Sequence, residues 1–595
     1  MIRTPLRAAL RFASSGCLGL ATLAALATVS HAAADPEKVL PDSTLFFFNV
    51  KNVAEFREGF NQSQFGQLLA DPAIKPLKDS IQDKLNQASK DLKAKLGVTI
   101  DELLKLPEGP AHVAIVTKTG GKVPIAVVVC ADAGKNEKAM TEVMMKSTKQ
   151  AEEANAKVGT EAFKGLTLHI IQPPADPDNK DKLNPPLIWT NSGSIFHLAT
   201  DKEALKDLLA HADGRSDALG TVDSYKKSKA KLGTDAPVSW FFDINKAIKL
   251  AVRTVQAKNG GGQNFEGILD QVGINGLKSA AGTFTFNSGA FDSVSKVYFL
   301  APAPTQGILK LFMMPPTGLR PEPWVPATVA SYQTMSWELD GAYDALNDLV
   351  NTFQPGMLNV LEQQLVGPNG GEPLSLKKDI FGPLGDRLTL ISEFKKPIKE
   401  DSQRLLLGVA LDDSKAFTNT LNKILGMTGA APAKRDFQGT TIYDFKLPDM
   451  PNVGNAPNNN PFKNGTASLA VAKDTLYLAT EPSFLEATLR GGASALADSP
   501  SFAAVAKQIP SKTSSLTYQR SDEQARVTYD MIKSGQYEEA FKKQPGGPDV
   551  SRVIDKDKIP DFSVFAKYLS EGGGFGLMEE DGVVFTNFTL KKTSP

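Results

Sequence analysis

A short stretch that occurs twice constrains the fold of this chain more than any other feature of its sequence. Residues 194–201 read SIFHLATD, and residues 474–481, which lie 280 positions later, read DTLYLATE. In each copy a short apolar strand pattern runs directly into a helix pattern. Thr200 and Thr480 stand where a helix N-cap is expected, and Glu203 completes a capping box in the first copy. The match predicts that the chain is a duplicated α+β unit.

The order of the predicted elements extends this likeness to two halves, 35–300 and 327–595, joined by a proline-rich linker at 301–326. In each half, strand pairs that resemble hairpins alternate with single helices, unlike the strict alternation of a doubly wound sheet. We therefore expect two similar halves, each a mainly antiparallel sheet with helices packed largely on one face. Chance recurrence of ordinary strand-then-helix patterning is the alternative explanation of the likeness.

The first 34 residues predict a signal peptide. Three arginines stand within the first eleven residues, 17–29 is an uncharged apolar run, and 30–34 offers small residues for cleavage before Asp35. The apolar run is shorter than the roughly 20 residues that a membrane span needs, so a membrane anchor is the less favoured alternative. We expect an exported protein, periplasmic or secreted, with no stable membrane insertion after cleavage.

Charge and cysteine content narrow the classes of partner and of chemistry. The chain has 66 basic and 66 acidic residues, and loss of the signal peptide would leave 63 against 66. Such a balance gives no electrostatic reason to expect nucleic acid or an anionic membrane as a partner. Cys130 would be the one cysteine of the processed chain, so no intrachain disulfide is expected. Its apolar neighbours at 127–129 favour a small buried hydrophobe over a reactive thiol.

Three histidines on predicted strands make a metal cluster the first candidate site: His112, His169 and His197. The second half carries Leu388, Tyr443 and Tyr477 at the places that match them. Apolar or aromatic replacements suit packing positions better than metal ligands, so we assign no metal site. His211 falls at the end of a predicted helix, where the helix dipole favours a cation.

Catalytic motifs do not form a consistent set. Residues 224–227 and 375–378 both match S-x-x-K, and 118–120 match K-T-G, but K-T-G precedes both serines and S-D-N is missing. The chain also has no G-x-S-x-G, no G-x-G-x-x-G, no P-loop and no H-E-x-x-H. The sequence therefore assigns no catalytic or cofactor-binding residue and predicts no cofactor. An enzyme stays the alternative to a protein without catalytic activity.

Three segments carry a resemblance to a known family. They are LPDST at 40–44, FGQLLADP at 65–72, and WVPA at 324–327 followed by SWELD at 336–340. They resemble a family of exported bacterial proteins of unknown function, over most of the chain that follows the signal peptide. The resemblance implies export and an α+β fold. It carries no catalytic residues to this chain, because the shared segments are turns and strand ends.

Two long polar loops, 172–186 and 447–464, fall at matching places in the two halves. Loops on a rigid scaffold often carry binding, although these two could equally be passive insertions. We therefore predict an exported protein of the cell envelope without enzymatic activity, which binds or scaffolds an unidentified protein or envelope component. The alternatives are an exported, hydrolase-like enzyme with a site between the two halves, and a passive structural component.

Overall fold

The computed structural model describes residues 35–88, 105–118, 124–174, 184–258, 265–366, 373–398, 402–427, 432–446, 466–536 and 554–592. The predicted signal peptide, most of the loop at 172–186 and the whole loop at 447–464 lie outside these ranges. The chain divides into two compact units. Unit 1 holds Met1–Asp71, Lys78–Glu266 and Leu277–Ala301, and unit 2 holds Pro72–Leu77, Gly267–Gly276 and Pro302–Pro595.

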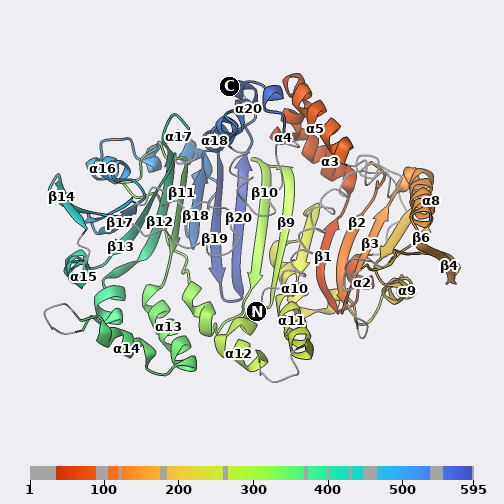
Figure 1. The fold of residues 1–595 in the computed structure, drawn as a ribbon, viewed down its shortest axis with the longest axis horizontal. Helices are drawn as coiled ribbons and strands as arrows, with labels where there is room; N and C mark the ends of the chain where they lie inside the picture. Colours follow the sequence, from red (N-terminus) through yellow and green to blue (C-terminus); the bar gives the residue numbers. More distant parts are fainter. Residues whose placement is uncertain are drawn as a thin grey trace. The chain divides into compact units, whose positions relative to one another are not determined.

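Unit 1 contains an antiparallel sheet whose described strands lie in the order β4-β5-β6-β7-β3-β2-β1-β8-β9-β10 (Figure 1, red to lime arrows). The strands are β1 (Thr44–Val50), β2 (Ala111–Thr117), β3 (Ile125–Asp132), β4 (Lys157–Phe163), β5 (Leu166–Gln172), β6 (Leu187–Ser192), β7 (Ile195–Ala199), β8 (Val238–Phe242), β9 (Ser279–Ser288) and β10 (Phe291–Leu300). β1 therefore lies inside the sheet, between β2 and β8.

Unit 2 contains an antiparallel sheet in the order β14-β15-β16-β17-β13-β12-β11-β18-β19-β20. Its strands are β11 (Ser331–Ser336), β12 (Leu384–Phe394), β13 (Gln403–Leu411), β14 (Ala433–Phe437), β15 (Thr440–Lys446), β16 (Thr466–Ala472), β17 (Thr475–Ala479), β18 (Ser515–Gln519), β19 (Gly572–Glu579) and β20 (Gly582–Leu590). Adding ten to each strand number of unit 1 gives this order. The predicted α+β class with mainly antiparallel sheets is confirmed.

Helices cover both faces of the sheet in unit 1, so the expectation that they pack largely on one face is wrong. Neighbouring residues of a strand point to opposite faces. Phe47 joins a cluster with Leu205 of α9 (Lys202–Ala210) and Tyr225 of α10 (Asp223–Leu232). Phe48 instead packs with Phe56 of α3 (Val53–Gln62). The run Phe46-Phe47-Phe48 is apolar at consecutive positions, and a strand of that kind needs cover on both sides.

The side of the sheet that α3 covers also carries α8 (Glu137–Glu153). Met140 and Met144 of α8 pack with Phe196 in one cluster. Phe196 lies directly opposite Ala131 across the ladder of β3 and β7, and Ala131 belongs to the Phe48 cluster. The two faces of this sheet are therefore buried by different pairs of helices.

The remaining described helices are α2 (Pro36–Val39), α4 (Gln64–Ala70), α5 (Lys75–Ala88), α11 (Ile244–Lys258), α12 (Phe265–Val272), α13 (Leu339–Phe353), α14 (Met357–Gln364), α15 (Ser414–Met427), α16 (Pro482–Arg490), α17 (Pro500–Ala506), α18 (Ser521–Lys533) and α20 (Phe562–Ala566). Shorter helical turns are η1 (Pro72–Ile74), η2 (Gly134–Asn136), η3 (Leu219–Thr221), η4 (Ile274–Gly276), η5 (Gly307–Phe312), η6 (Leu376–Phe381), η7 (Leu496–Asp498) and η9 (Lys556–Lys558).

Within the described ranges, no helix has the length and apolar character that a membrane crossing requires. The segment expected as a linker contains η5, and its Val325 is fully buried.

Thr200 and Thr480 do not cap the helices that follow them, which corrects the prediction from the repeat. The N-cap of α9 is Asp201, whose carboxylate accepts a hydrogen bond from the Ala204 N–H at 3.0 Å. Thr200 Oγ1 instead accepts from the Val127 N–H at 2.9 Å. In unit 2, Thr480 Oγ1 accepts from the Leu405 N–H at 2.9 Å, and Glu481 occupies the N-cap position. Each threonine hydroxyl thus joins its strand end to the adjacent strand.

The glycine run at the start of β19 allows neighbouring side chains to approach the strand closely. A β-carbon added at Gly573 would overlap Cγ1 of Val505 on α17 and lie 3.0 Å from Cζ of Phe588.

We expect Gly573→Ala to lower the free energy of unfolding of unit 2 by about 1–3 kcal/mol, the usual cost of an overpacked core. Urea denaturation of the purified chain measures this change. Gly426→Ala is the matched control, because an added β-carbon there meets nothing within 4 Å; equal stability of the two variants would contradict the close approach.

Candidate functional site

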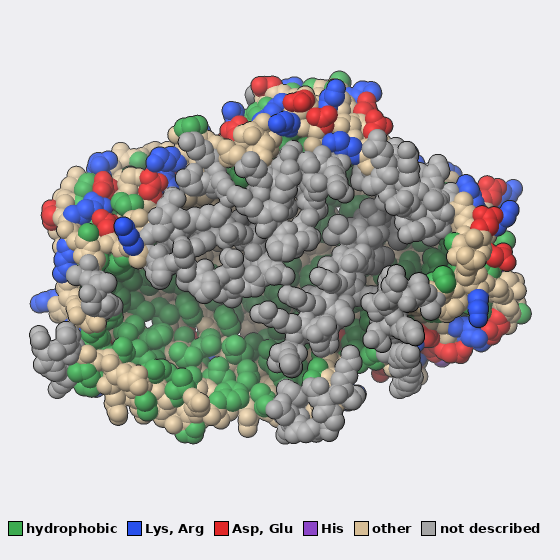
Figure 2. All heavy atoms as spheres, in the orientation of Figure 1, with side chains coloured by type: hydrophobic (Ala, Val, Ile, Leu, Met, Phe, Trp, Pro, Cys, Tyr) green, Lys and Arg blue, Asp and Glu red, His purple; other side chains and the backbone are tan. Residues whose placement is uncertain are grey.

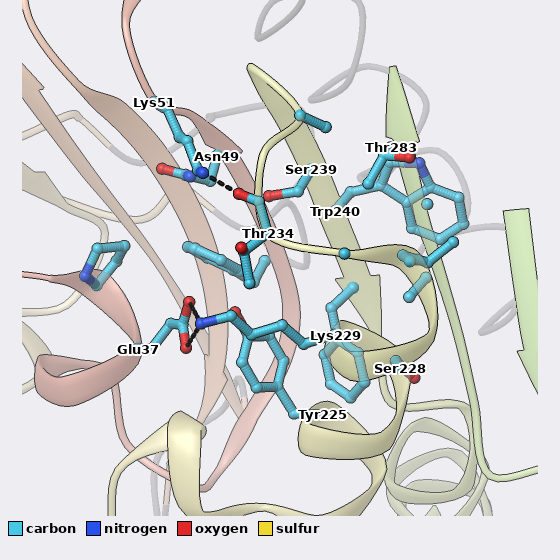
Figure 3. Close-up of a pocket in the computed structure, with 18 of the residues that line it drawn as sticks. Glu37, Asn49, Lys51, Tyr225, Ser228, Lys229, Thr234, Ser239, Trp240 and Thr283 are labelled. Carbon is cyan, nitrogen blue, oxygen red and sulfur yellow. Dashed lines mark hydrogen bonds and ion pairs between the residues drawn. The ribbon is translucent and has the colours of Figure 1, made fainter. Parts of the chain in front are cut away.

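Unit 1 contains a cavity of about 370 Å³ between α10, α2 and the strands β1, β8 and β9 (Figure 3). Side chains and backbone of 20 residues line it: Asp35, Pro36, Glu37, Phe47, Asn49, Lys51, Pro110, Tyr225, Ser228, Lys229, Leu232, Gly233, Thr234, Ala236, Ser239, Trp240, Phe241, Ala281, Gly282 and Thr283. Its four charged residues are two acids and two lysines, so the lining is neutral as a whole. We take this cavity as the candidate functional site.

Helix α10 forms one wall because its buried side rests on the central strands. The ring of Tyr225 meets Phe241 edge-on, with ring centroids 5.1 Å apart, and lies 6.3 Å from Phe47. One turn later, Ser228 Oγ lies 3.1 Å from Ser279 Oγ in a buried hydrogen bond. Gly233 ends the helix with φ 82°, a backbone conformation that favours glycine, and turns the chain along the edge of the cavity.

The opposite wall is the short helix α2, which backbone hydrogen bonds hold in place. The Arg215 N–H donates to the Lys38 carbonyl at 3.0 Å, and the Leu219 N–H donates to the Leu40 carbonyl at 2.7 Å. These bonds orient Glu37 toward α10, where both of its carboxylate oxygens lie 2.6 Å from Lys229 Nζ (Figure 3). The two walls are therefore linked by an ion pair at the cavity.

The strands that form the floor of the cavity contribute three polar side chains among apolar ones. Asn49 lies opposite Ser239, and Ser239 lies opposite Thr283, across three neighbouring strands. The same register continues from Asn49 to His112, then to Cys130, His197 and Thr190. Seven polar or ionisable side chains thus cross seven strands in one line, which we call the polar row. Sequence reasoning did not find the cavity, but its signal was present as single polar residues inside apolar strands.

The histidine end of the polar row contains ring nitrogens that have no described hydrogen-bond partner. Nε2 of His112 and Nδ1 of His197 are buried atoms with no partner among the described residues. Burial, and then the proximity of His197, lower the pKa of His112 to about 3, and burial lowers the pKa of His197 to about 4. Both rings are therefore neutral at physiological pH. Cys130 between them is buried, as predicted, and burial followed by the charge of Asp132 raises the pKa of its thiol to about 12.

The other sequence candidates lie apart from the cavity. His169 stacks on Trp189 with ring centroids 4.1 Å apart, and His211 Nδ1 lies 2.9 Å from the Asp207 carbonyl oxygen at the end of α9. Within the described ranges, no group of three or more His, Cys, Asp or Glu side chains is arranged to hold a metal ion. Ser375 of the second S-x-x-K match accepts from the Lys378 N–H at 3.3 Å, so this match is a helix cap.

Tyr225 and Lys229, which lie one turn apart on α10, are the titratable side chains that this helix brings to the cavity. Their surroundings oppose proton transfer near neutral pH. Burial first, and then the Glu37 carboxylate, raise the pKa of Tyr225 well above its usual range. The Lys229 ammonium, which could otherwise favour a tyrosinate, is held by Glu37 instead. The arrangement is suited to donating and accepting hydrogen bonds from a ligand.

At two of its three positions, the cavity floor is matched by apolar residues in unit 2. Thr334, Leu516 and Phe575 lie opposite one another on β11, β18 and β19, in the register that Asn49, Ser239 and Thr283 occupy in unit 1. Leu516 is 3% exposed. The same register places Thr389, not Leu388 as expected, at the position of His112, because Thr389 pairs with Thr334 and Gly408.

Comparison with known proteins gives no family. No family model matches the chain, and no curated protein matches it. Among solved structures, one titled "Structure of crystal form III of TP0453" matches with 7% sequence identity and a TM-score of 0.22, over 47% of this chain and 84% of that chain. At this TM-score the likeness carries no argument about fold or function.

The buried histidine of the polar row predicts acid sensitivity of unit 1. His112 is 4% exposed, and its pKa in the folded chain, about 3, lies below the value of about 6.5 in the unfolded chain. As pH falls below 6.5 the unfolded chain binds the proton first, so stability is fully present above pH 6.5 and is lost toward pH 3. Between pH 7 and pH 5 the loss from this group is about 2 kcal/mol.

Urea denaturation of the purified chain at pH 7 and pH 5 measures this loss. His112→Gln removes the titrating group and is expected to reduce the difference between the two pH values, whatever its effect at pH 7. His211→Gln is the control, because His211 lies at the solvent-facing end of α9 with its side chain 38% exposed. If His112→Gln and His211→Gln have the same pH dependence as the unchanged chain, His112 is not the source of the sensitivity.

Proposed function

We propose that this chain is an exported binding protein without enzymatic activity, and that the unit 1 cavity binds a small ligand of no net charge. We further propose that the two units are copies of one module, of which unit 1 retains the open site. The expectation of export comes from the signal-peptide pattern of residues 1–34 and from the family resemblance. Cleavage before Asp35 would start the processed chain at the edge of the cavity, because Asp35 is one of its lining residues.

The observation that carries this proposal is the contrast between matching positions in the two sheets. In unit 2 the positions of Ser239 and Thr283 hold two apolar residues, the buried Leu516 and the half-buried Phe575. In unit 1 the same positions hold hydroxyls that face a cavity. A fold that can be packed with leucine and phenylalanine does not need a polar floor for stability, so a ligand is the simplest reason for one.

The chemistry of the lining indicates the class of ligand. Glu37 neutralises Lys229, and the Lys51 ammonium donates to the Thr234 carbonyl oxygen (Figure 3). Because the two acids and two lysines of the lining balance, the cavity as a whole favours a ligand without net charge. Asn49 and the two hydroxyls of the floor offer both donors and acceptors. Phe47 and Phe241, on β1 and β8, add an apolar part to the floor. A small neutral or zwitterionic molecule with several hydrogen-bonding groups and an apolar side fits this set.

Support for two copies of one module comes from corresponding details in the two units. The strand orders agree, and Thr200 and Thr480 make the same hydrogen bond to the adjacent strand. An ion pair recurs as well. Lys118, just after β2, pairs with Asp201, and Lys395, just after β12, lies 3.2 Å from Glu481. Asp201 and Glu481 are the two N-cap residues, so the same helix end is neutralised in both units.

Native mass spectrometry of the chain recovered from expressing cells tests the binding proposal. We expect a small molecule to travel with the protein, and neutral sugars or free amino acids to raise its melting temperature if the native ligand is lost. Ser239→Leu should abolish both effects, because leucine occupies the hydrogen-bonding floor. Ser192→Leu, at the exposed end of β6, is the control and should bind normally.

Two outcomes would oppose the proposal. Equal binding by Ser239→Leu and the unchanged chain would show that the cavity is not the site. Conversion of the bound molecule into a product by the purified chain would show that the protein is an enzyme, which would contradict a function of binding alone. The mass of the recovered chain also tests export, because cleavage before Asp35 predicts a chain that lacks residues 1–34.

A further inference from the structure

An apolar stripe lies on the outer side of α14 in unit 2. Met357, Val360 and Leu361 follow one another at helical spacings of three and four, and they are 41%, 53% and 39% exposed. Phe353, at the end of α13, is 51% exposed and precedes them. Figure 2 shows hydrophobic side chains gathered in the part of unit 2 where Figure 1 labels α13 and α14. We call these four residues the α14 stripe.

The stripe is separate from the side of α14 that packs on unit 2. Leu358 faces inward and is 6% exposed, so the helix already has a buried side. A helix at the surface of a protein ordinarily carries polar residues on its remaining side. Exposed apolar residues at positions i, i+3 and i+4 are instead typical of a helix that packs against a second helix. The stripe therefore indicates an interaction surface that is separate from the cavity of unit 1.

The charges of α14 decide which partner fits. Helices that bind membrane surfaces carry lysine and arginine beside their apolar stripe, and α14 has neither. Its one charged residue, Glu362, is turned toward the protein, where its Oε1 accepts from the Leu376 N–H at 2.7 Å. The outer flanks are Asn359, Gln363 and Gln364. These uncharged side chains let an identical helix approach without repulsion between like charges.

We propose that two copies of this chain associate through the α14 stripe, with α14 of one copy packed against α14 of the other around a two-fold axis. Such a contact is self-complementary, as a two-fold interface requires. The four partly exposed side chains of the stripe form a contact much smaller than that of a stable dimer. Stable dimers bury about 800 Å² per copy, so this contact makes a weak dimer that forms at high protein concentration.

Sedimentation equilibrium of the full chain, over protein concentrations from micromolar to hundreds of micromolar, tests the proposal. The unchanged chain should pass from monomer to dimer across this range. Val360→Asp places a charge in the middle of the contact and should weaken the association at least tenfold. Met145→Asp is the matched control, because Met145 is a 47% exposed apolar residue on helix α8 of unit 1. It should dimerise as the unchanged chain does.

Pairing of opposite charges tests the geometry. Val360→Asp and Val360→Lys should each be monomeric alone and should associate when mixed, because the two-fold axis brings position 360 of one copy near that of the other. A chain that stays monomeric at every concentration would overturn the proposal. So would dimers that survive Val360→Asp in a folded chain, or a mixture that fails to associate. Binding of the unchanged chain to neutral phosphatidylcholine vesicles, lost in Val360→Asp, would assign the stripe to a membrane and also overturn it.

Discussion

The alternation of side chains along β1 is the constraint on which the arrangement of unit 1 depends. β1 lies between β2 and β8, with an antiparallel neighbour on each side, so its backbone groups are used on both edges. Phe47 and Phe48 then emerge on opposite faces, and each needs a cover of its own. Helices α9 and α10 bury one face, whereas α3 and α8 bury the other. The walls of the candidate site exist because α10 must rest on Phe47 and Phe241.

The polar row is the exception to this apolar plan, and it gives unit 1 its distinctive chemistry. Asn49, Ser239 and Thr283 face the cavity, whereas His112 is buried without a described partner for its Nε2. A buried polar atom without a partner costs free energy, and an open floor gives up packing contacts. At the matching register positions, unit 2 holds Leu516 and Phe575 in place of Ser239 and Thr283. Native proteins commonly accept such a loss of stability at functional sites.

Sequence reasoning predicted those parts of the fold that depend on local patterns. The repeated stretch does run from a strand into a helix in both copies, as predicted: β7 and β17 end at Ala199 and Ala479, and α9 and α16 begin at Lys202 and Pro482. The role of Thr200 was predicted wrongly, since its hydroxyl reaches Val127, a residue 73 positions away that no local pattern reveals. The sequence also matched His112 with Leu388, whereas the strand register matches it with the next residue, Thr389. Local patterns could not reveal this register either. Only the cross-strand pairs fix a register, and a shift of one reverses the face.

The candidate site was beyond prediction because it is assembled from distant segments. Glu37 and Lys229 are 192 residues apart in the chain, and the floor comes from three strands that are neighbours only in the sheet. What the sequence did hold was a set of isolated polar residues in apolar strands, such as Ser239 between Val238 and Trp240. Without the register, such residues cannot be told from outward-facing positions of a half-exposed strand.

The most direct measurement of the central claim is the free energy of unfolding of a Ser239→Leu, Thr283→Phe chain in the absence of ligand. These changes give the floor of unit 1 the residues that unit 2 has at the matching positions. If the floor is polar in order to bind a ligand, the variant should be as stable as the unchanged chain, or more stable by about 1–2 kcal/mol from the added apolar burial. A loss of 2 kcal/mol or more would show that the hydroxyls are needed for the fold itself, and it would contradict the account.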